Sequence, residues 1–88
     1  MKIKDGFLLR EVAGNYIVIA VGEDSENFNN IITINELGAF IWNRINEGKG
    51  IEEIADDITG EYSVEREVAV NDINDFVNQL AEVNVIEK

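Results

Sequence analysis

The pattern of apolar and polar positions changes its period once along the chain, near residue 35. Before that point, short runs rich in β-branched residues alternate with turn-forming residues, which is typical of strands. After it, apolar residues recur every three or four positions, which is typical of amphipathic helices. The sequence therefore predicts an α+β fold in which a sheet is followed by helices, and we expect one domain over residues 1–88.

The first part predicts a three-stranded antiparallel meander. Phe7–Val12 and residues 16–21 are the first two strands, and Gly14-Asn15 between them is a two-residue turn whose members tolerate positive φ. The polar stretch 22–30 is expected to be a loop, and residues 31–34 a short third strand.

The second part predicts three helices. The first spans Glu36–Asn46, the second is a helix of about nine residues from Ile51, and the third carries an apolar face from Ala69 to Leu80. The second and third helices have the size and turn of a helix-turn-helix. Five residues are expected to start or stop these helices: Asn35, Gly48, Gly60, Ser63 and Asn84. An apolar tail, Val85-Ile86, follows.

Charge changes what a helix-turn-helix would mean here. Seven basic and eighteen acidic residues give a net charge of −11, which repels nucleic acid and anionic lipid. Over the third helix, five acidic residues stand against Arg66 alone, a net of −4. Because phosphate contacts need cations, we expect no nucleic-acid partner.

The composition lacks the residue types that most often carry out catalysis. The chain has no histidine and no cysteine, so the usual general base, thiol nucleophile and soft metal ligands are missing. The carboxylates Glu52-Glu53 and Asp56-Asp57 are interpreted as a solvated helix face, and the loop 24–29 lacks the glycine and distal glutamate of a calcium loop. We expect a protein that is not an enzyme, with no cofactor and no metal.

No signal-peptide core and no run of about twenty apolar residues occurs in the sequence. We therefore expect a cytoplasmic protein without a membrane partner.

The third strand is the remaining special feature, because it lacks the lysine and proline that usually protect a sheet edge. An unprotected edge beside an apolar helix face favours β-augmentation, in which a guest peptide adds a strand. Two alternatives stay open: the chain's own tail covers this edge, or a second copy pairs with it in a homodimer.

Three motifs in order resemble the pyrroloquinoline-quinone biosynthesis protein D (PqqD) family. They are the segment 34–42, the pair Glu47-Gly48 with the segment 51–55, and an ending of Tyr62, Val64, Asp72-Ile73 and residues 76–80. Ile34 stands where the family usually has leucine, and Asn84 where it tends to have glycine. Both departures are conservative, and the resemblance covers essentially the whole chain.

The resemblance implies a winged helix-turn-helix that acts as a RiPP recognition element, a domain that binds the leader of a ribosomally made precursor peptide. Such a domain delivers the leader to a modifying enzyme, often a radical S-adenosylmethionine (SAM) maturase. The leader would pair with the third strand in a groove shared with the third helix. The implied peptide-binding residues are Asn30, Ile31, Ile32, Thr33, Ile34, Ala69, Asp72, Ile73, Phe76 and Leu80.

Helical geometry refines this set. Ile73 and Leu80 lie near the centre of the apolar stripe, where core packing can explain them. Ala69, Asp72 and Phe76 lie at one margin, and Val70 and Val77 lie at the other. The sequence does not decide which margin faces the third strand, and we expect the first to do so. Trp42 lies off its helix's stripe, so it packs under the sheet or is partly exposed. The alternative functions are an acidic winged-helix regulator that acts through protein contacts and a homodimer that pairs its third strands.

Overall fold

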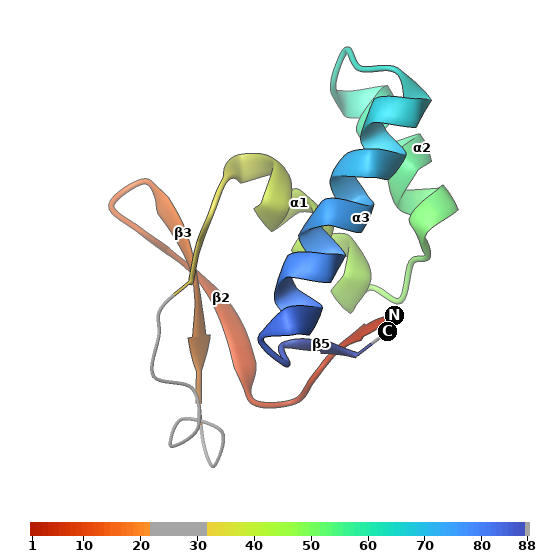
Figure 1. Ribbon diagram of the computed structural model, residues 1–88. Coiled ribbons are helices and arrows are strands. Elements are labelled where there is room, and N and C mark those ends of the chain that lie inside the picture. The colour runs from red at the N-terminus through yellow and green to blue at the C-terminus, as the bar shows by residue number, and fades with distance from the viewer. Residues whose placement is uncertain (22–31, 88) are drawn as a thin grey trace.

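The computed structural model describes residues 1–21 and 32–87. A three-stranded antiparallel sheet lies beside a group of three helices, and a two-stranded sheet joins the chain ends (Figure 1). This architecture confirms the predicted α+β fold. The elements are β1 (Lys2–Ile3), β2 (Phe7–Val12), β3 (Asn15–Ala20), β4 (Ile32–Ile34), α1 (Glu36–Asn46), α2 (Ile51–Glu61), α3 (Arg66–Glu82) and β5 (Ile86–Glu87).

The hairpin of β2 and β3 forms as predicted, but its turn lies one residue earlier. Ala13 and Gly14 have φ values of 52° and 81°, and Val12 pairs with Asn15 across them. The prediction of a Gly14-Asn15 turn was therefore wrong. Two successive residues with positive φ match the strand twist, and Ala13 accepts this conformation next to a glycine that takes it without steric cost.

The predicted loop 22–30, with the discounted calcium-like segment 24–29, lies outside the described residues. So do Asn30 and Ile31 of the predicted peptide-pairing strand.

Helix α1 begins and ends where the sequence predicts. The Asn35 side chain accepts a hydrogen bond from the Gly38 N–H at 2.7 Å, which satisfies one of the free donors of the first turn. Gly48 follows the C-cap with φ 85°, a left-handed conformation that stops the helix.

The boundaries of α2 and α3 differ from the prediction. Gly60 lies inside the last turn of α2, which runs on to Glu61, because nothing forces this glycine out of helical geometry. Ser63 is not the cap of α3; the cap position is Glu65, and Arg66 begins the helix. Asn84, with φ 64°, ends the last turn as predicted.

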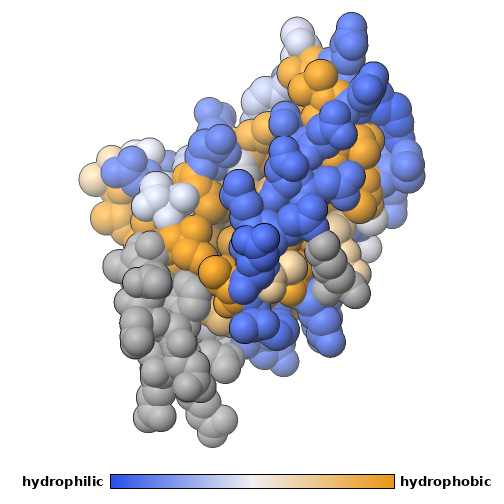
Figure 2. Space-filling view, in the orientation of Figure 1, coloured by the Kyte–Doolittle hydropathy of each residue, from blue (hydrophilic) through white to orange (hydrophobic). Residues whose placement is uncertain are grey.

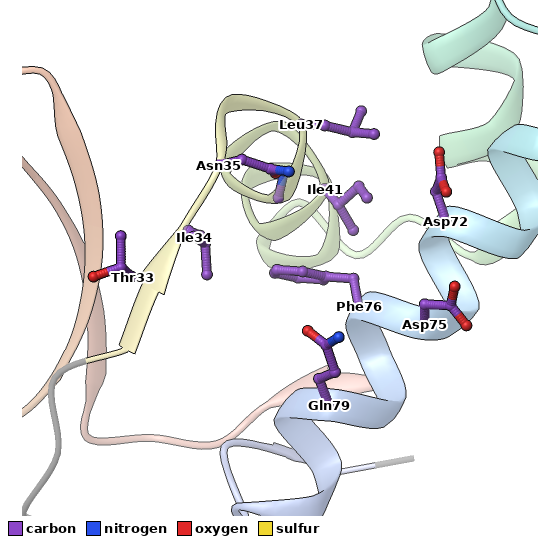
Figure 3. A pocket seen from close by; sticks show the side chains of 10 residues that line it. Thr33, Ile34, Asn35, Leu37, Ile41, Asp72, Asp75, Phe76 and Gln79 are labelled. Atoms are coloured by element: carbon purple, nitrogen blue, oxygen red, sulfur yellow. The ribbon is translucent and has the colours of Figure 1, made fainter.

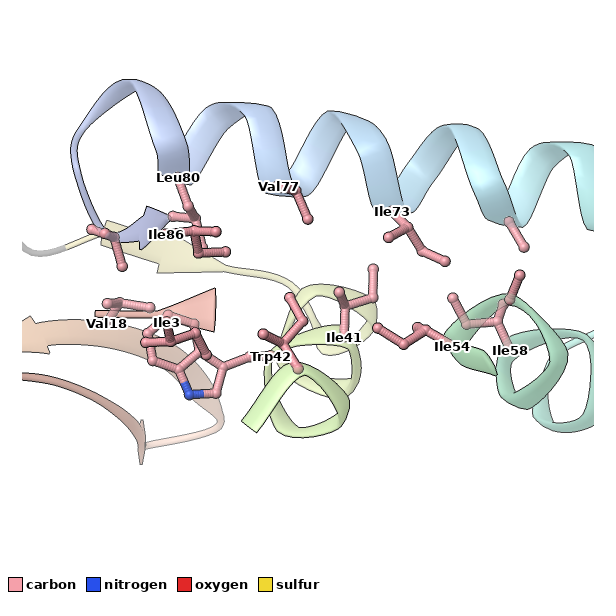
Figure 4. Packing of buried hydrophobic residues seen from close by; sticks show 14 residues of the cluster. Ile3, Val18, Ile41, Trp42, Ile54, Ile58, Ile73, Val77, Leu80 and Ile86 are labelled. Atoms are coloured by element: carbon pink, nitrogen blue, oxygen red, sulfur yellow. The ribbon is translucent and has the colours of Figure 1, made fainter. Parts of the chain in front are cut away.

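The core lies between the sheet, α1, α2 and the inner face of α3 (Figure 4). Trp42 is only 1% exposed and belongs to the same cluster as Ile3 and Val18, so it packs beneath the strands. The alternative of a partly exposed Trp42 was therefore wrong. The other buried apolar residues come mainly from the three helices: Ala39, Ile41, Ile45, Ile54, Ala55, Ile58, Ala69, Ile73, Val77, Leu80, Val85 and Ile86.

The C-terminal tail does not lie against β4. Val85 and Ile86 are buried, and β5 pairs antiparallel with β1, with Ile3 opposite Ile86. The Lys4 N–H also donates to the Val85 carbonyl at 2.9 Å. The chain's own tail, one of the occupants considered for the third strand, is therefore used elsewhere.

Candidate functional site

One edge of the larger sheet is open within the part of the chain that the structure describes. The strand order is β2-β3-β4, so β4 has a paired side toward β3 and an outer side with no described neighbour strand. Such an edge can accept another strand through its backbone groups.

One backbone contact next to the β2–β3 hairpin shows which residues of β3 hydrogen-bond to β2 and which hydrogen-bond to β4. The Val21 N–H donates to the Gly6 carbonyl at 2.7 Å, and this pair continues the β2–β3 register. Hydrogen-bonded and non-hydrogen-bonded pairs alternate in an antiparallel ladder. Odd-numbered residues of β3 therefore direct their backbone groups to β2, and even-numbered residues direct theirs to β4.

This phase fixes which residue of β4 faces outward. Tyr16 pairs with Ile34 and Val18 pairs with Ile32, so the backbone groups of both isoleucines point toward β3. The N–H and C=O of Thr33 consequently point to the open edge. Thr33 is thus the residue of β4 that presents a donor and an acceptor to a guest strand.

A pocket of about 330 Å³ opens beside this edge, between the end of β4, α1 and α3 (Figure 3). Figure 3 shows Ile34 and Phe76 pointing toward each other across it. Its lining residues are Thr33, Ile34, Asn35, Leu37, Gly38, Ile41, Asp72, Asp75, Phe76 and Gln79. In the space-filling view, an apolar band lies between the sheet and the hydrophilic outer face of α3 (Figure 2).

Close packing of α1 against α3 forms the floor of the pocket. A Cβ atom at Gly38 would lie 3.0 Å from Phe76 Cε1 and 3.2 Å from Ile34 Cβ. The absence of a side chain at Gly38 therefore lets the Phe76 ring and Ile34 approach the helix and present an apolar surface.

The structure brings together only part of the predicted set. Thr33, Ile34, Asp72 and Phe76 line the pocket, and Ile32 is half-buried on the inner face of β4. The other three members of the set on α3 are buried in the core and do not line the pocket: Ala69, Ile73 and Leu80.

Six lining residues were not in the predicted set: Asn35, Leu37, Gly38, Ile41, Asp75 and Gln79. Asp75 and Gln79 follow Asp72 and Phe76 by three residues, so helical spacing alone could have added them. The contribution of α1 has no comparable local signal, because it depends on how α1 packs against α3.

The single cation of α3 is bound within the chain. The Arg66 guanidinium pairs with the carboxylates of Glu52 and Asp56 on α2 and donates to the Glu52 carbonyl oxygen at 3.3 Å. These carboxylates raise the pKa of Arg66, chiefly through the hydrogen bond with Glu52 and then that with Asp56. Helix α3 therefore offers no unpaired cation to a phosphate backbone.

Two further features bear on what the site can do. In the parts of the chain that the structure describes, no three acidic residues come close enough to hold a metal ion. No helix among the described residues is long and apolar enough to cross a membrane.

These features define a class: a winged helix-turn-helix with an open sheet edge beside a pocket that combines apolar side chains with two carboxylates. The chain belongs to the family of coenzyme PQQ synthesis protein D (PqqD), whose model matches residues 8–86. No curated protein gives a significant match to the sequence.

Two solved structures share the fold. TbiB1 in complex with the TbiA(beta) leader peptide is 30% identical, with a TM-score of 0.82, and the match covers 99% of this chain and 95% of TbiB1. Lasso peptide synthetase B1 complexed with the leader peptide is 23% identical, with a TM-score of 0.78, over 92% of this chain and 89% of that one.

Proposed function

We propose that this chain binds the leader segment of a ribosomally made precursor peptide by adding it as a strand to β4. The observation that carries the proposal is the outward-facing backbone of Thr33 beside a pocket lined by Ile34, Ile41 and Phe76. Backbone bonds to the edge would supply affinity, and side chains that enter the pocket would supply specificity. Asn30 and Ile31 remain part of the proposed pairing strand.

Membership of the PqqD family supports this proposal, as does the likeness to TbiB1, a protein solved with a leader peptide bound. In this function the chain catalyses no reaction and needs no cofactor. It holds the leader so that a modifying enzyme can act on the rest of the precursor, and the family resemblance suggests a radical SAM maturase for that role.

A binding titration with two halves of one peptide tests the proposal. The leader half of a precursor encoded beside the gene is labelled and titrated with the full chain, and its fluorescence anisotropy is followed. We expect saturable binding at micromolar affinity or tighter. The core half of the same precursor, labelled in the same way, is the matched control and should bind at least about tenfold more weakly. Equal binding of both halves, or none, contradicts the proposal.

The open edge also suits a homodimer in which two β4 strands pair across a two-fold axis. The net charge of −11 on each copy opposes this arrangement, whereas it favours a basic or neutral guest. Light scattering at several protein concentrations separates the two. A stable dimer that leader peptide does not dissociate would favour the homodimer.

A further inference from the structure

The polar side chains of the pocket are unevenly charged. Among its ten lining residues are two carboxylates, Asp72 and Asp75, and no lysine or arginine. Both belong to α3 and precede Phe76, Asp72 by about one helical turn and Asp75 by one residue. Figure 3 shows Asp72 at the end of the pocket near Leu37, where β4 runs into α1, and Gln79 at the opposite end.

These two carboxylates have no counter-charge within the part of the chain that the structure describes. The cations that form ion pairs there are Arg44, Lys49 and Arg66, and their partners are other acidic residues, none of which lines the pocket. Asp72 and Asp75 accept no side-chain hydrogen bond from a described residue either. A cation on a guest peptide would therefore not have to displace a cation of the described chain from these carboxylates.

The pocket also sets where such a cation would lie relative to an apolar side chain. Along α3, the rise from Asp72 to Phe76, four positions later, is about 6 Å. In an extended peptide, side chains two residues apart point to the same face and are separated by about 6.6 Å. A guest strand on β4 could thus place one side chain against Phe76 and the next one on that face beside Asp72.

We propose that the peptide this groove selects carries a lysine or arginine two residues from a bulky apolar residue. The apolar side chain would rest on Ile34, Ile41 and Phe76, and the cation would face Asp72 at the end of the groove near Leu37, with Asp75 one helical turn away as the second carboxylate. This inference rests on the proposed function, because it assumes a strand paired with β4.

Two carboxylates alone do not make a divalent-metal site, since calcium needs six to eight oxygen ligands and magnesium needs octahedral geometry. A single guest cation is satisfied by two carboxylates, and arginine can meet one of them with two parallel hydrogen bonds.

A random-peptide display library, selected against the full-length chain, tests the inference. The selected peptides should share a bulky apolar residue with a lysine or arginine two positions away. Selection against the D72N/D75N variant should keep the apolar preference and lose the basic one. The matched control is E67Q/E82Q, which removes two exposed carboxylates of the same helix outside the pocket and should keep both preferences.

The dissociation constants of a selected peptide for the variants measure how much the two carboxylates contribute to binding. A peptide from the wild-type selection should bind D72N/D75N about five- to tenfold more weakly, the range expected for one or two partly exposed charge pairs. It should bind E67Q/E82Q within about twofold of wild type. The D72K/D75K variant should reverse the preference, so that the same peptide with glutamate in place of the basic residue binds better than the original.

The outcomes separate the inference from the proposed function. Enriched peptides without a basic residue at that spacing, or a basic preference that survives in D72N/D75N, overturn the inference and leave strand addition intact. A library that yields no binding peptide to a folded chain, as checked by circular dichroism, overturns both.

Discussion

At the scale of single residues, Gly38 controls how closely α1, β4 and α3 meet. Its missing side chain is what allows the Phe76 ring to lie 3.0 Å from the position a Cβ atom would take. Gly60, inside α2, is different because nothing lies within 4 Å of its Cβ position. The two glycines therefore form a matched pair for testing the pocket floor.

We expect Gly38→Ala to weaken peptide binding several-fold, because the added methyl group pushes the Phe76 ring into the groove. Gly60→Ala should leave binding unchanged and raise the free energy of unfolding by about 0.5–1 kcal/mol, since alanine favours the helix. Urea unfolding and anisotropy titration of both variants measure this. Unchanged binding by a folded Gly38→Ala variant would show that the Phe76 ring does not form the binding surface.

A second residue-scale prediction concerns Asp57, which joins α2 to the end of α1. A hydrogen bond from Lys49 Nζ at 2.7 Å lowers the pKa of Asp57 below its usual 3.8, and Arg44 acts in the same direction while partial desolvation opposes it. Because the folded-state pKa is lowered, the stabilisation is fully present above pH 3.8 and is lost as the pH falls through the folded-state value.

Asp57→Asn should therefore be less stable than the wild type near neutral pH. The difference between the two proteins should shrink once the pH drops below about 3.8, and urea unfolding across this range measures it. A difference that stays constant from neutral pH to well below that value would contradict the assigned role of the Lys49–Asp57 pair.

At the scale of elements, the open edge depends on a single outward-facing amide in β4. Thr33→Pro removes that N–H, and proline is tolerated on an edge strand when its nitrogen faces away from the sheet. We expect this variant to stay folded and to lose about tenfold in peptide affinity, because the backbone hydrogen bond from that N–H is lost.

The matched control is Thr33→Ala, which keeps the amide and shortens a side chain on the exposed face of the sheet. It should bind within about twofold of the wild type. Comparable losses in the two variants would mean that the Thr33 side chain, and not its backbone, makes the contact.

The elements themselves were largely predictable, because their signals are local. The Asn35 cap, the Gly48 stop and the period change at residue 35 all act within a few residues, and the structure has α1 where they place it. The predicted position of the hairpin turn was wrong by one residue, because Ala13 has a positive φ, which alanine rarely adopts. That shift reverses which residues of β3 face β2, so the outward direction of Thr33 could not be read from the sequence.

The helical residues of the site were predictable only where they belong to a single helix, α3. The family resemblance implied Asp72, Phe76 and Ala69, and the helical spacing placed all three at one margin of α3; Asp72 and Phe76 line the pocket, whereas Ala69 is fully buried in the core. The pairing of β5 with β1 joins residues from opposite ends of the chain, and such nonlocal contacts leave no pattern in either segment.

At the scale of the whole molecule, we expect charge and shape together to decide which class of partner the chain binds. A winged helix-turn-helix could lie in a DNA groove, but the net charge of −11 and the internal pairing of Arg66 oppose phosphate contacts. We expect the same charge to attract basic peptides to the groove beside β4. We expect a peptide to fill this groove as an added strand.

Amide hydrogen exchange at Thr33, followed by NMR, tests whether a guest strand pairs with β4. In the free protein the outward N–H should exchange quickly; with a binding peptide at about one hundred times its dissociation constant, exchange should slow by about a hundredfold. A peptide that binds and shifts other amides while leaving Thr33 exchange unchanged would contradict strand addition to β4.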